Sequence, residues 1–263
     1  MNFQDGSEQG FADAELSVDA FLGGRLQIAQ PRVGYRAGVD PVLLAASVPA
    51  KAGARVLELG CGGGVASLCL ARRVDVSLTG VDVQQRYAAL AVQNAKRNGI
   101  EMSVHCADLT ALPAELRQQQ FDHVLANPPY YDRSRSTVAR EPGRETGLGE
   151  ATPLALWLDT ASKRLAPGGG LTMIQRADRL PDMLGALPAS LGSAILQPFA
   201  PRRGKPAHLI ILQAKKGGRA DFRLNAPIVM HQGDAHSEKG KDYNPLIEAT
   251  LREGAALDWS VPD

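Results

Sequence analysis

The sequence predicts an α/β protein built on a single doubly wound, mostly parallel sheet of seven strands. Short apolar segments alternate with longer segments of helical character through the middle of the chain, which is the pattern of successive strand–helix–strand units. A glycine-dense turn at residues 60–64 follows the first of these apolar segments, and polar residues follow several of the later ones. A short hairpin and helix are expected before the sheet, and an extension after it.

The bulk composition excludes several classes of protein. Hydrophobic residues make up 44% of the 263 residues and charged residues 22%, the balance of an ordinary globular protein. A net charge of +1 does not indicate a nucleic-acid-binding protein, so any such evidence must come from local clusters. The three cysteines and five histidines lack disulfide or metal-ligand spacing, so we expect reduced thiols, a cytoplasmic location and no metal. Residues 1–10 are too polar for a signal peptide, and no segment is apolar enough to span a membrane.

Three parts of the chain are expected. Residues 1–50 form an N-terminal leader, hairpin and cap helix, residues 51–215 form the main ligand-binding domain, and residues 216–263 form a C-terminal extension packed on that domain. Nothing in the sequence indicates the oligomeric state.

The N-terminal part begins with an acidic stretch, residues 1–19, which we expect to be a frayed leader. Residues 21–39 alternate short apolar pieces with glycines, which predicts a hairpin over the sheet edge. Asp40 followed by Pro41 is typical of a helix start, so a helix is expected at residues 42–48. Asp40 is therefore either a helix cap or a ligand-binding residue.

The first strand is predicted at residues 54–59 and its crossover helix at 65–73, with the glycine turn between them. Such a turn suits either a dinucleotide or S-adenosylmethionine. The dinucleotide fingerprint counted from Gly60 requires glycine or alanine at Val65, and the frame from Gly62 meets Ser67 instead. The turn therefore favours S-adenosylmethionine.

Acidic residues end the next two predicted strands. Asp82 follows the strand at 76–81, where a carboxylate can accept both hydroxyls of a ribose; alternatively it caps the helix at 84–98. Asp108 follows the strand at 102–106 and precedes Leu109, so it is either a ligand contact or a cap.

The fourth strand, residues 121–126, ends at Asn127-Pro128-Pro129-Tyr130. Because prolines cannot continue a strand, the chain must leave the sheet at Asn127, with its amide at the strand's carboxyl end. The side-chain carbonyl of Asn127 and the backbone carbonyl of Pro128 could accept hydrogen bonds from one planar NH2 group. They would favour its pyramidal form, in which the nitrogen lone pair is free. Tyr130 could stack on a flat substrate. A proline-rich turn with a surface tyrosine is the alternative.

The segment from Val56 to Gly64, taken with Asn-Pro-Pro-Tyr, resembles the S-adenosylmethionine-dependent methyltransferases that act on planar amino groups. With the opening segment, residues 20–215 most resemble the bacterial tRNA1(Val) adenine-37 N6-methyltransferases. The resemblance implies the methyltransferase fold and transfer to N6 of adenine in tRNA. It assigns catalysis to Asn127, Pro128 and Tyr130. It assigns cofactor binding to Glu58, Gly60, Cys61, Gly62, Asp82, Val83, Ala107, Asp108, Asn127, Arg36 and Asp40.

Two basic stretches suggest contact with tRNA. The loop at residues 131–149 carries four arginines and could close over a nucleotide, or could simply be mobile. Between residues 202 and 219 there are six basic residues and no acid, although charged strand ends are common on proteins of many kinds. The predicted substrate-binding residues are Tyr130, Arg133, Arg135, Arg202, Arg203 and Lys205.

The remaining elements complete the sheet. Helices are predicted at 153–165, 177–187 and 245–252, strand five at 171–175, an antiparallel pair at 194–199 and 208–213, and an edge strand at 222–230. Residues 242–245 could cap the last helix or hold substrate.

Other functions share these motifs. Release-factor glutamine N5-methyltransferases also carry Asn-Pro-Pro-Tyr, but usually have a separate helical domain before the sheet, whereas about 50 residues precede it here. DNA adenine or ribosomal guanine is a further possible target. A cofactor-binding RNA-interaction protein without catalysis would not need the polarising turn.

Overall fold

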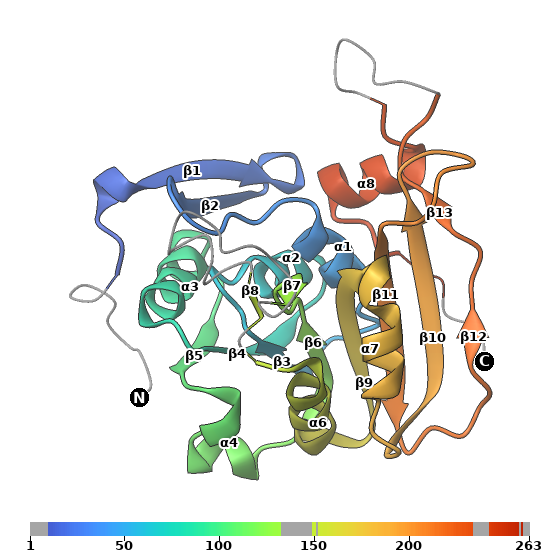
Figure 1. Cartoon of the computed structure of the whole chain (residues 1–263). Helices are drawn as coiled ribbons and strands as arrows, with labels where there is room; N and C mark the ends of the chain where they lie inside the picture. The colour runs from blue at the N-terminus through green and yellow to red at the C-terminus, as the bar shows by residue number, and fades with distance from the viewer. Residues whose placement is uncertain (1–9, 133–148, 151, 234–241, 258, 260–263) are drawn as a thin grey trace.

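The computed structural model describes residues 10–132, 149–150, 152–233, 242–257 and 259 (Figure 1). In the described residues the centre is a nine-stranded sheet in the order β12-β10-β11-β9-β6-β3-β4-β5, with β13 also paired to β10. Seven of these strands confirm the predicted sheet: β3 (Ala54–Leu59), β4 (Val76–Asp82), β5 (Met102–Cys106), β6 (Phe121–Ala126), β9 (Leu165–Arg176), β10 (Leu191–Ala200) and β11 (Leu209–Lys216). Among them only β11 runs antiparallel to its neighbours.

The strand count exceeds the predicted seven by two because the expected edge strand at 222–230 joins the same sheet, and does so as two short strands. These are β12 (Arg223–Leu224) and β13 (Ile228–Val229), both parallel to β10. Pro227 lies between them and has no backbone N–H to donate, so one continuous ladder cannot form.

Strand β9 begins six residues before the predicted start at 171. Its pairing with β6 shifts register between Phe121 and His123, so residues 167–170, which precede the predicted strand, are taken up as an irregularity within the observed one.

Helices cover both faces of the sheet, as the doubly wound prediction requires. Consecutive strand residues alternate between two cores: Val56 packs with α1 and α2, whereas Leu57 packs with α6 and α7. The α-helices are α1 (Asp40–Ala46), α2 (Val65–Arg73), α3 (Gln85–Arg97), α4 (Ala114–Gln118), α6 (Leu154–Arg164), α7 (Leu180–Gly185) and α8 (Pro245–Glu253), and the 3-10 turns are η1 (Asp13–Glu15), η2 (Leu22–Gly24), η3 (Leu109–Ala111) and η4 (Ala177–Arg179). Among the described residues no helix is both long and apolar enough to cross a membrane.

The predicted position of the N-terminal hairpin, residues 21–39, was wrong. The hairpin consists of β1 (Leu16–Phe21) and β2 (Leu26–Pro31), so part of the expected frayed leader is a strand. Leu16 is buried against Tyr87 and Leu90 of α3, which supplies the free energy that orders this stretch. The hairpin therefore lies over α3 rather than over the sheet edge (Figure 1).

Asn94 of α3 and Asn98 at its C-cap bind the hairpin through pairs of hydrogen bonds to its backbone, like those of a neighbouring strand. Asn94 accepts a hydrogen bond from the Ala29 N–H at 2.8 Å and donates to the Ala29 carbonyl at 3.0 Å. One turn along the helix, Asn98 makes the same two bonds with Gln27, at 2.8 and 2.9 Å. Asn94 also donates to the Gly63 carbonyl at 2.9 Å, so one buried amide joins the hairpin to the glycine turn.

The chain between β6 and α6 and the chain after β13 are described in part. The loop predicted at 131–149 shows only β7 (Tyr131–Asp132) paired with β8 (Gly149–Glu150); residues 133–148 lie outside the described part. Before α8, Asn244 accepts from the Ile247 N–H at 2.8 Å, which confirms the capping alternative for residues 242–245.

We predict that replacing Asn94 by alanine lowers the free energy of unfolding by about 2–4 kcal/mol, because it leaves buried backbone groups of Ala29 and Gly63 without partners. The matched variant is Asn98→Ala, whose bonds are more exposed and which should cost less than about 1.5 kcal/mol. Urea denaturation measures both. Equal losses would contradict the structural role given to Asn94.

Candidate active site

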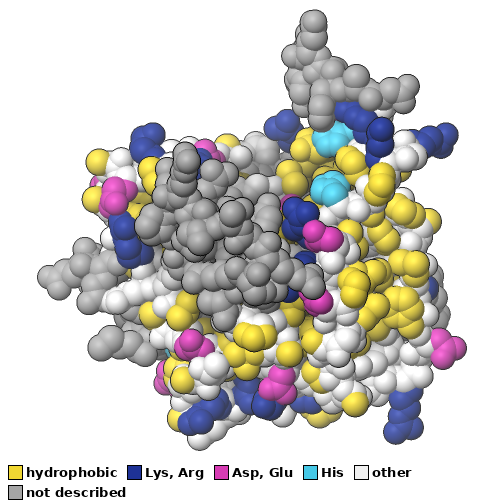
Figure 2. All heavy atoms as spheres, viewed as in Figure 1, with side chains coloured by type: hydrophobic (Ala, Val, Ile, Leu, Met, Phe, Trp, Pro, Cys, Tyr) yellow, Lys and Arg dark blue, Asp and Glu magenta, His cyan; other side chains and the backbone are white. Residues whose placement is uncertain are grey.

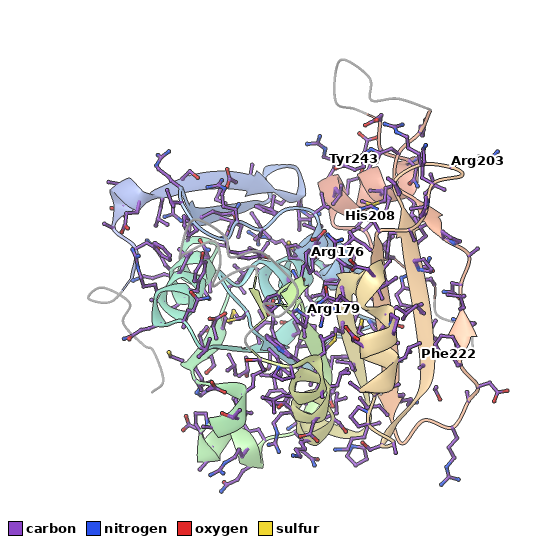
Figure 3. All side chains as sticks on the ribbon, in the orientation of Figure 1. Arg176, Arg179, Arg203, His208, Phe222 and Tyr243 are labelled. Carbon is purple, nitrogen blue, oxygen red and sulfur yellow. The ribbon has the colours of Figure 1, made fainter. Side chains whose placement is uncertain are left out.

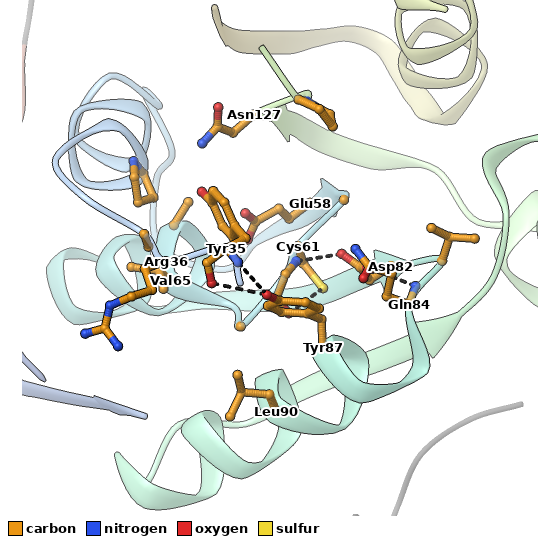
Figure 4. A pocket seen from close by; sticks show the side chains of 18 of the residues that line it. Tyr35, Arg36, Glu58, Cys61, Val65, Asp82, Gln84, Tyr87, Leu90 and Asn127 are labelled. Carbon is orange, nitrogen blue, oxygen red and sulfur yellow. Dashed lines mark hydrogen bonds between the residues drawn. The ribbon is translucent and has the colours of Figure 1, made fainter. Parts of the chain in front are cut away.

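A cavity of about 840 Å³ lies at the carboxyl ends of β3, β4, β5 and β6 (Figure 4). Its roof is the chain between β2 and α1. All the residues predicted to bind the cofactor or to act in catalysis line this cavity, from Arg36 and Asp40 in the roof to Asn127 and Tyr130 on the far wall. The size is typical of a small-molecule site.

The glycine turn allows close packing behind the cavity. Gly60 has a φ of +64°, and a Cβ built on it would come within 2.5 Å of the Trp157 ring. Trp157 comes from α6 and is itself buried, with its indole N–H 3.3 Å from the Thr152 carbonyl. Glycine is therefore required at this position by both the backbone conformation and the neighbouring ring.

Glu58 lies beneath the turn and is 3% exposed. One of its oxygens accepts from the backbone N–H of Ser67 at 3.0 Å and from its hydroxyl at 2.5 Å. Burial outweighs these bonds and raises the pKa of Glu58 to about 7. The group is thus poised to gain or lose its proton near neutral pH.

Asp82 joins the ends of two strands. One oxygen accepts from the Gly62 N–H and the other from the Gln84 N–H, both at 2.8 Å, so the carboxylate fixes the glycine turn as well as the start of α3 (Figure 4). Burial raises its pKa to about 6. The next residue, Val83, leaves 61% of its surface exposed at the cavity.

Asp108 performs the capping role that the sequence offered as an alternative. It accepts from the Thr110 N–H at 2.8 Å and from the Thr110 hydroxyl at 2.7 Å, and these bonds lower its pKa. It also lines the cavity beside Ala107.

The roof is tied to α3 and to the hairpin. The Tyr87 hydroxyl accepts from the Tyr35 N–H at 3.0 Å and donates to the Tyr35 carbonyl at 3.1 Å (Figure 4). The guanidinium of Arg36 donates to Asp19 at 2.6 Å and to the Pro31 carbonyl at 2.7 Å. These bonds commit its charge to the hairpin, although a cofactor contact was predicted.

Asp40 does not cap α1. The helix N-cap is Val39, without a side-chain cap bond, and the Asp40 carboxylate instead accepts a hydrogen bond from the Tyr130 hydroxyl. Burial raises the pKa of both groups. Tyr130 is therefore held by α1, where the sequence suggested only a stacking surface.

Asn127 lies at the end of β6, as the two prolines require, and lines the cavity (Figure 4). Behind it the buried Gln175 of β9 places its amide nitrogen 3.4 Å from the carbonyl oxygens of both Pro128 and Pro129. Because these contacts are long, they brace the turn while leaving the Pro128 carbonyl able to accept a further bond.

Comparison with known proteins decides the family. The model of a methyltransferase domain matches residues 56–141. The tRNA1(Val) (adenine(37)-N6)-methyltransferase of Yersinia enterocolitica is 30% identical over 210 residues, covering 74% of this chain and 80% of the relative. The chain therefore belongs to the family of tRNA1(Val) (adenine(37)-N6)-methyltransferases. The enzyme of the same name from Dickeya chrysanthemi is 24% identical over 243 residues, covering 90% of this chain and 94% of the relative.

Solved structures support the fold. A predicted O-methyltransferase from Agrobacterium tumefaciens superposes with a TM-score of 0.69 at 26% identity, over 84% of this chain and all of that one. A 16S rRNA methyltransferase of T. thermophilus, in complex with AdoMet and guanosine, superposes with a TM-score of 0.53 at 20% identity, over 76% of this chain and 50% of that one. The protein is an S-adenosylmethionine-dependent methyltransferase, and the expected fold and cofactor are confirmed.

The cavity suits this cofactor, which carries positive charge on its sulfur and its amino group. Four carboxylates line the cavity: Asp40, Glu58, Asp82 and Asp108. The described lining also includes two arginines, Arg32 and Arg36, and Arg36 is paired with Asp19. The described part of the lining therefore has an excess of negative charge, which favours a ligand of net positive charge.

The predicted substrate residues divide between surface and interior. Arg203 and Lys205 are exposed in the turn between β10 and β11. Arg202 is instead buried: its guanidinium donates to the Asp242 carboxylate and, at 2.8 Å, to the Gly233 carbonyl. Its prediction as a surface contact was wrong because Asp242 lies across the turn. Arg133 and Arg135 lie outside the described residues.

Several residues of the site were not predicted from the sequence. Gln175 could have been found, because it is a polar residue near the end of an apolar strand, like Asp82 and Asn127. Tyr87 and Trp157 could not, because an aromatic residue on a helix is more often part of the core.

We predict that affinity for S-adenosylmethionine weakens as the pH falls through about 7, because protonation of Glu58, followed by Asp82 near pH 6, removes the charge that faces the cofactor. The dissociation constant should rise by up to about tenfold per pH unit below the pKa, since one unit corresponds to about 1.4 kcal/mol. Calorimetry from about pH 8 to about pH 5.5 measures it. Glu58→Gln is the matched variant and should be flat until Asp82 titrates; a flat wild-type profile would contradict the prediction.

Proposed function

We propose that the protein transfers the methyl group of S-adenosylmethionine to N6 of adenine 37 in tRNA. One observation carries the proposal. Asn127 and Pro128, which offer two carbonyl acceptors, line the same cavity as the residues suited to the cofactor. The substrate named for the relatives, an adenine of tRNA1(Val), presents a flat exocyclic amine of the kind such a pair of acceptors would bind.

The cofactor residues then take distinct roles. We assign the ribose hydroxyls to Asp82 and the adenine to Val83, Ala107 and Asp108, which lie at the adjoining strand ends. The glycine turn, comprising Gly60, Cys61 and Gly62 above Glu58, would hold the amino-acid end, with Asp40 near it. The cofactor, when bound, supplies a methyl group on a positively charged sulfur, and the electrons of the S–C bond return to sulfur as the methyl leaves.

Asn127 and Pro128 act on the amine. The side-chain oxygen of Asn127 and the backbone oxygen of Pro128 accept hydrogen bonds from the two N6 hydrogens. These bonds favour the pyramidal nitrogen, whose lone pair then forms the new N–C bond. The nitrogen becomes positively charged as it gains the methyl, so it loses a proton to solvent without a strong base. The protein's contribution is therefore orientation and polarisation.

Tyr130 and Asp40 fix the width of the substrate slot. The Tyr130 ring follows the two prolines, and its hydroxyl is bonded to the carboxylate of Asp40 on α1. A ring held at both ends can stack on an extruded base without losing further freedom on binding. An anticodon-loop base is already partly unpaired, which lowers the cost of extruding it.

The proposal is tested by incubating the protein with methyl-labelled S-adenosylmethionine and, separately, tRNA, DNA or release factor, and digesting the products. We expect label in N6-methyladenosine from tRNA. Label found only in protein would support glutamine methylation, and cofactor binding without transfer would support a non-catalytic RNA-interaction protein.

In the same assay Asn127→Ala should lower kcat by about 10²–10³, the usual cost of removing one preorganised transition-state hydrogen bond, with cofactor affinity unchanged. Asn98→Ala is the matched control, because Asn98 bonds the hairpin away from the cavity. Turnover that survives Asn127→Ala would remove the assigned role.

We further predict that Tyr130→Phe and Asp40→Asn are coupled. Each removes the bond between α1 and the catalytic turn, so the double variant should lose little beyond either single one, with a coupling energy of about 1–3 kcal/mol in kcat/KM for tRNA. A double-mutant cycle measures this. Additive losses would show that the two side chains act independently.

A further inference from the structure

The turn between β10 and β11, residues 201–208, lies at the pocket end of the sheet. Strands β6, β9 and β10 all run in the same direction, so the end of β10 lies at the edge where β6 delivers Asn127. Figure 3 shows Arg176, His208 and Arg203 following one another along this edge. Arg203, Lys205 and His208 are all exposed.

The turn is fixed in place from below. Arg202 points inward and donates to the carbonyls of Gln232 and Gly233, and its ion pair with Asp242 is buried. Asp242 also lies 3.1 Å from the His231 ring, which stacks on Tyr243 with centroids 4.6 Å apart. The β10–β11 turn and the segment after β13 are thus joined through one ion pair into a single structural unit.

This unit is connected to the wall of the cavity through β9. Arg176, at the end of β9, faces Leu209 in the register of β11, and the Ala177 N–H donates to the His208 carbonyl at 2.9 Å. Gln175, the residue before Arg176, has its amide nitrogen 3.4 Å from the Pro129 carbonyl oxygen, directly before Tyr130 in the chain. A path of basic and aromatic side chains therefore runs from Tyr130 to Arg203.

The surface around the β10–β11 turn has a net positive charge in the described residues. Among the described acids along this path, Asp178 is paired with Arg176 at 2.9 Å, Asp242 is paired with Arg202, and Asp40 accepts a hydrogen bond from Tyr130. Figure 2 shows Lys, Arg and His side chains gathered over this end of β10 and β11. Arg203 and Lys205 add positive charge that no described acid balances.

The fold also divides the basic stretch that the sequence presents as one cluster. Lys215 and Lys216 end β11, and Arg219 follows, at the opposite end of the hairpin from Arg203. The Lys216 ammonium donates to the Leu165 carbonyl at 2.8 Å. Only the first half of the cluster therefore lies at the same end of the sheet as the cavity.

We propose that Arg203, Lys205 and His208, here called the rim surface, bind the sugar–phosphate backbone of the tRNA whose adenine enters the cavity. The inference rests on the proposed function and adds to it the path of the RNA strand. Arg203 and Lys205 are exposed cations on a rigid turn and suit phosphate groups, which fix the register of a nucleic acid without reading its bases. Burial lowers the pKa of His208, so its ring acts here as a neutral hydrogen-bonding group. The buried Arg202 fixes this turn against the segment after β13.

The test compares two double variants of equal charge. Arg203→Glu with Lys205→Glu changes the rim surface, and Lys215→Glu with Arg219→Glu changes the opposite end; each replaces two exposed positive charges by two negative ones. We measure KM and Kd for tRNA over a range of salt concentrations, kcat at saturating tRNA, and cofactor affinity.

The rim variant should raise KM for tRNA by about tenfold or more and reduce the slope of log Kd against log salt by about 2, because two phosphates of the RNA are then no longer neutralised by the protein. Its kcat at saturation and its cofactor affinity should be unchanged, and the opposite-end variant should stay within about twofold of wild type.

Other outcomes overturn the inference. Equal losses in the two variants, or a larger loss at the opposite end, would show that the rim surface has no special role, while methylation of tRNA by the wild type would leave the proposed function standing. Wild-type protein that binds cofactor but transfers no label to tRNA would overturn the proposed function itself, and the rim surface with it.

Discussion

The site depends on one constraint of the backbone. Strand β6 cannot continue past Asn127, because two prolines follow it and neither offers a hydrogen bond to the sheet. The strand is central, flanked by β3 and β9, so it ends at the edge where the glycine turn and Asp82 also end their strands. Parallel strands thus bring the Asn127 amide and the glycine turn into one cavity. Gln175 on β9 keeps that geometry by bracing the proline carbonyls from behind.

The cavity also depends on the charge of its buried carboxylates. Glu58 and Asp82 are both buried, and burial raises the pKa of each, to about 7 and about 6. Each carboxylate is used twice: it orients the backbone through hydrogen bonds and it supplies negative potential. Without a cation nearby this arrangement costs free energy, because ionised carboxylates are poorly solvated there. A cationic cofactor offsets that cost on binding. The acidic cavity and the basic rim surface therefore differ in charge, although both lie at the edge of the sheet where β6 and β10 end.

The sequence predicted what local rules determine and missed what distant contacts determine. The central strands and the strand-end positions of Asp82, Asp108 and Asn127 follow from apolar segments and from proline and glycine chemistry. Asp40 was assigned to a cap or to the cofactor because its actual partner, Tyr130, is 90 residues away. Arg202 was assigned to the surface because nothing local indicates Asp242, 40 residues later. The strand at Leu16–Phe21 was taken for a leader because the buried surface that orders it belongs to α3.

These distant contacts explain why the segment before β3 belongs to the site. Asn94 joins the hairpin to the Gly63 carbonyl, Tyr87 holds the roof at Tyr35, and Asp40 carries the same chain on to Tyr130. A parallel sheet alone would leave the cavity open above the strand ends. The N-terminal chain closes it by contacting both the glycine turn, at Gly63, and Tyr130. A displacement of this chain would therefore remove support from both places at once.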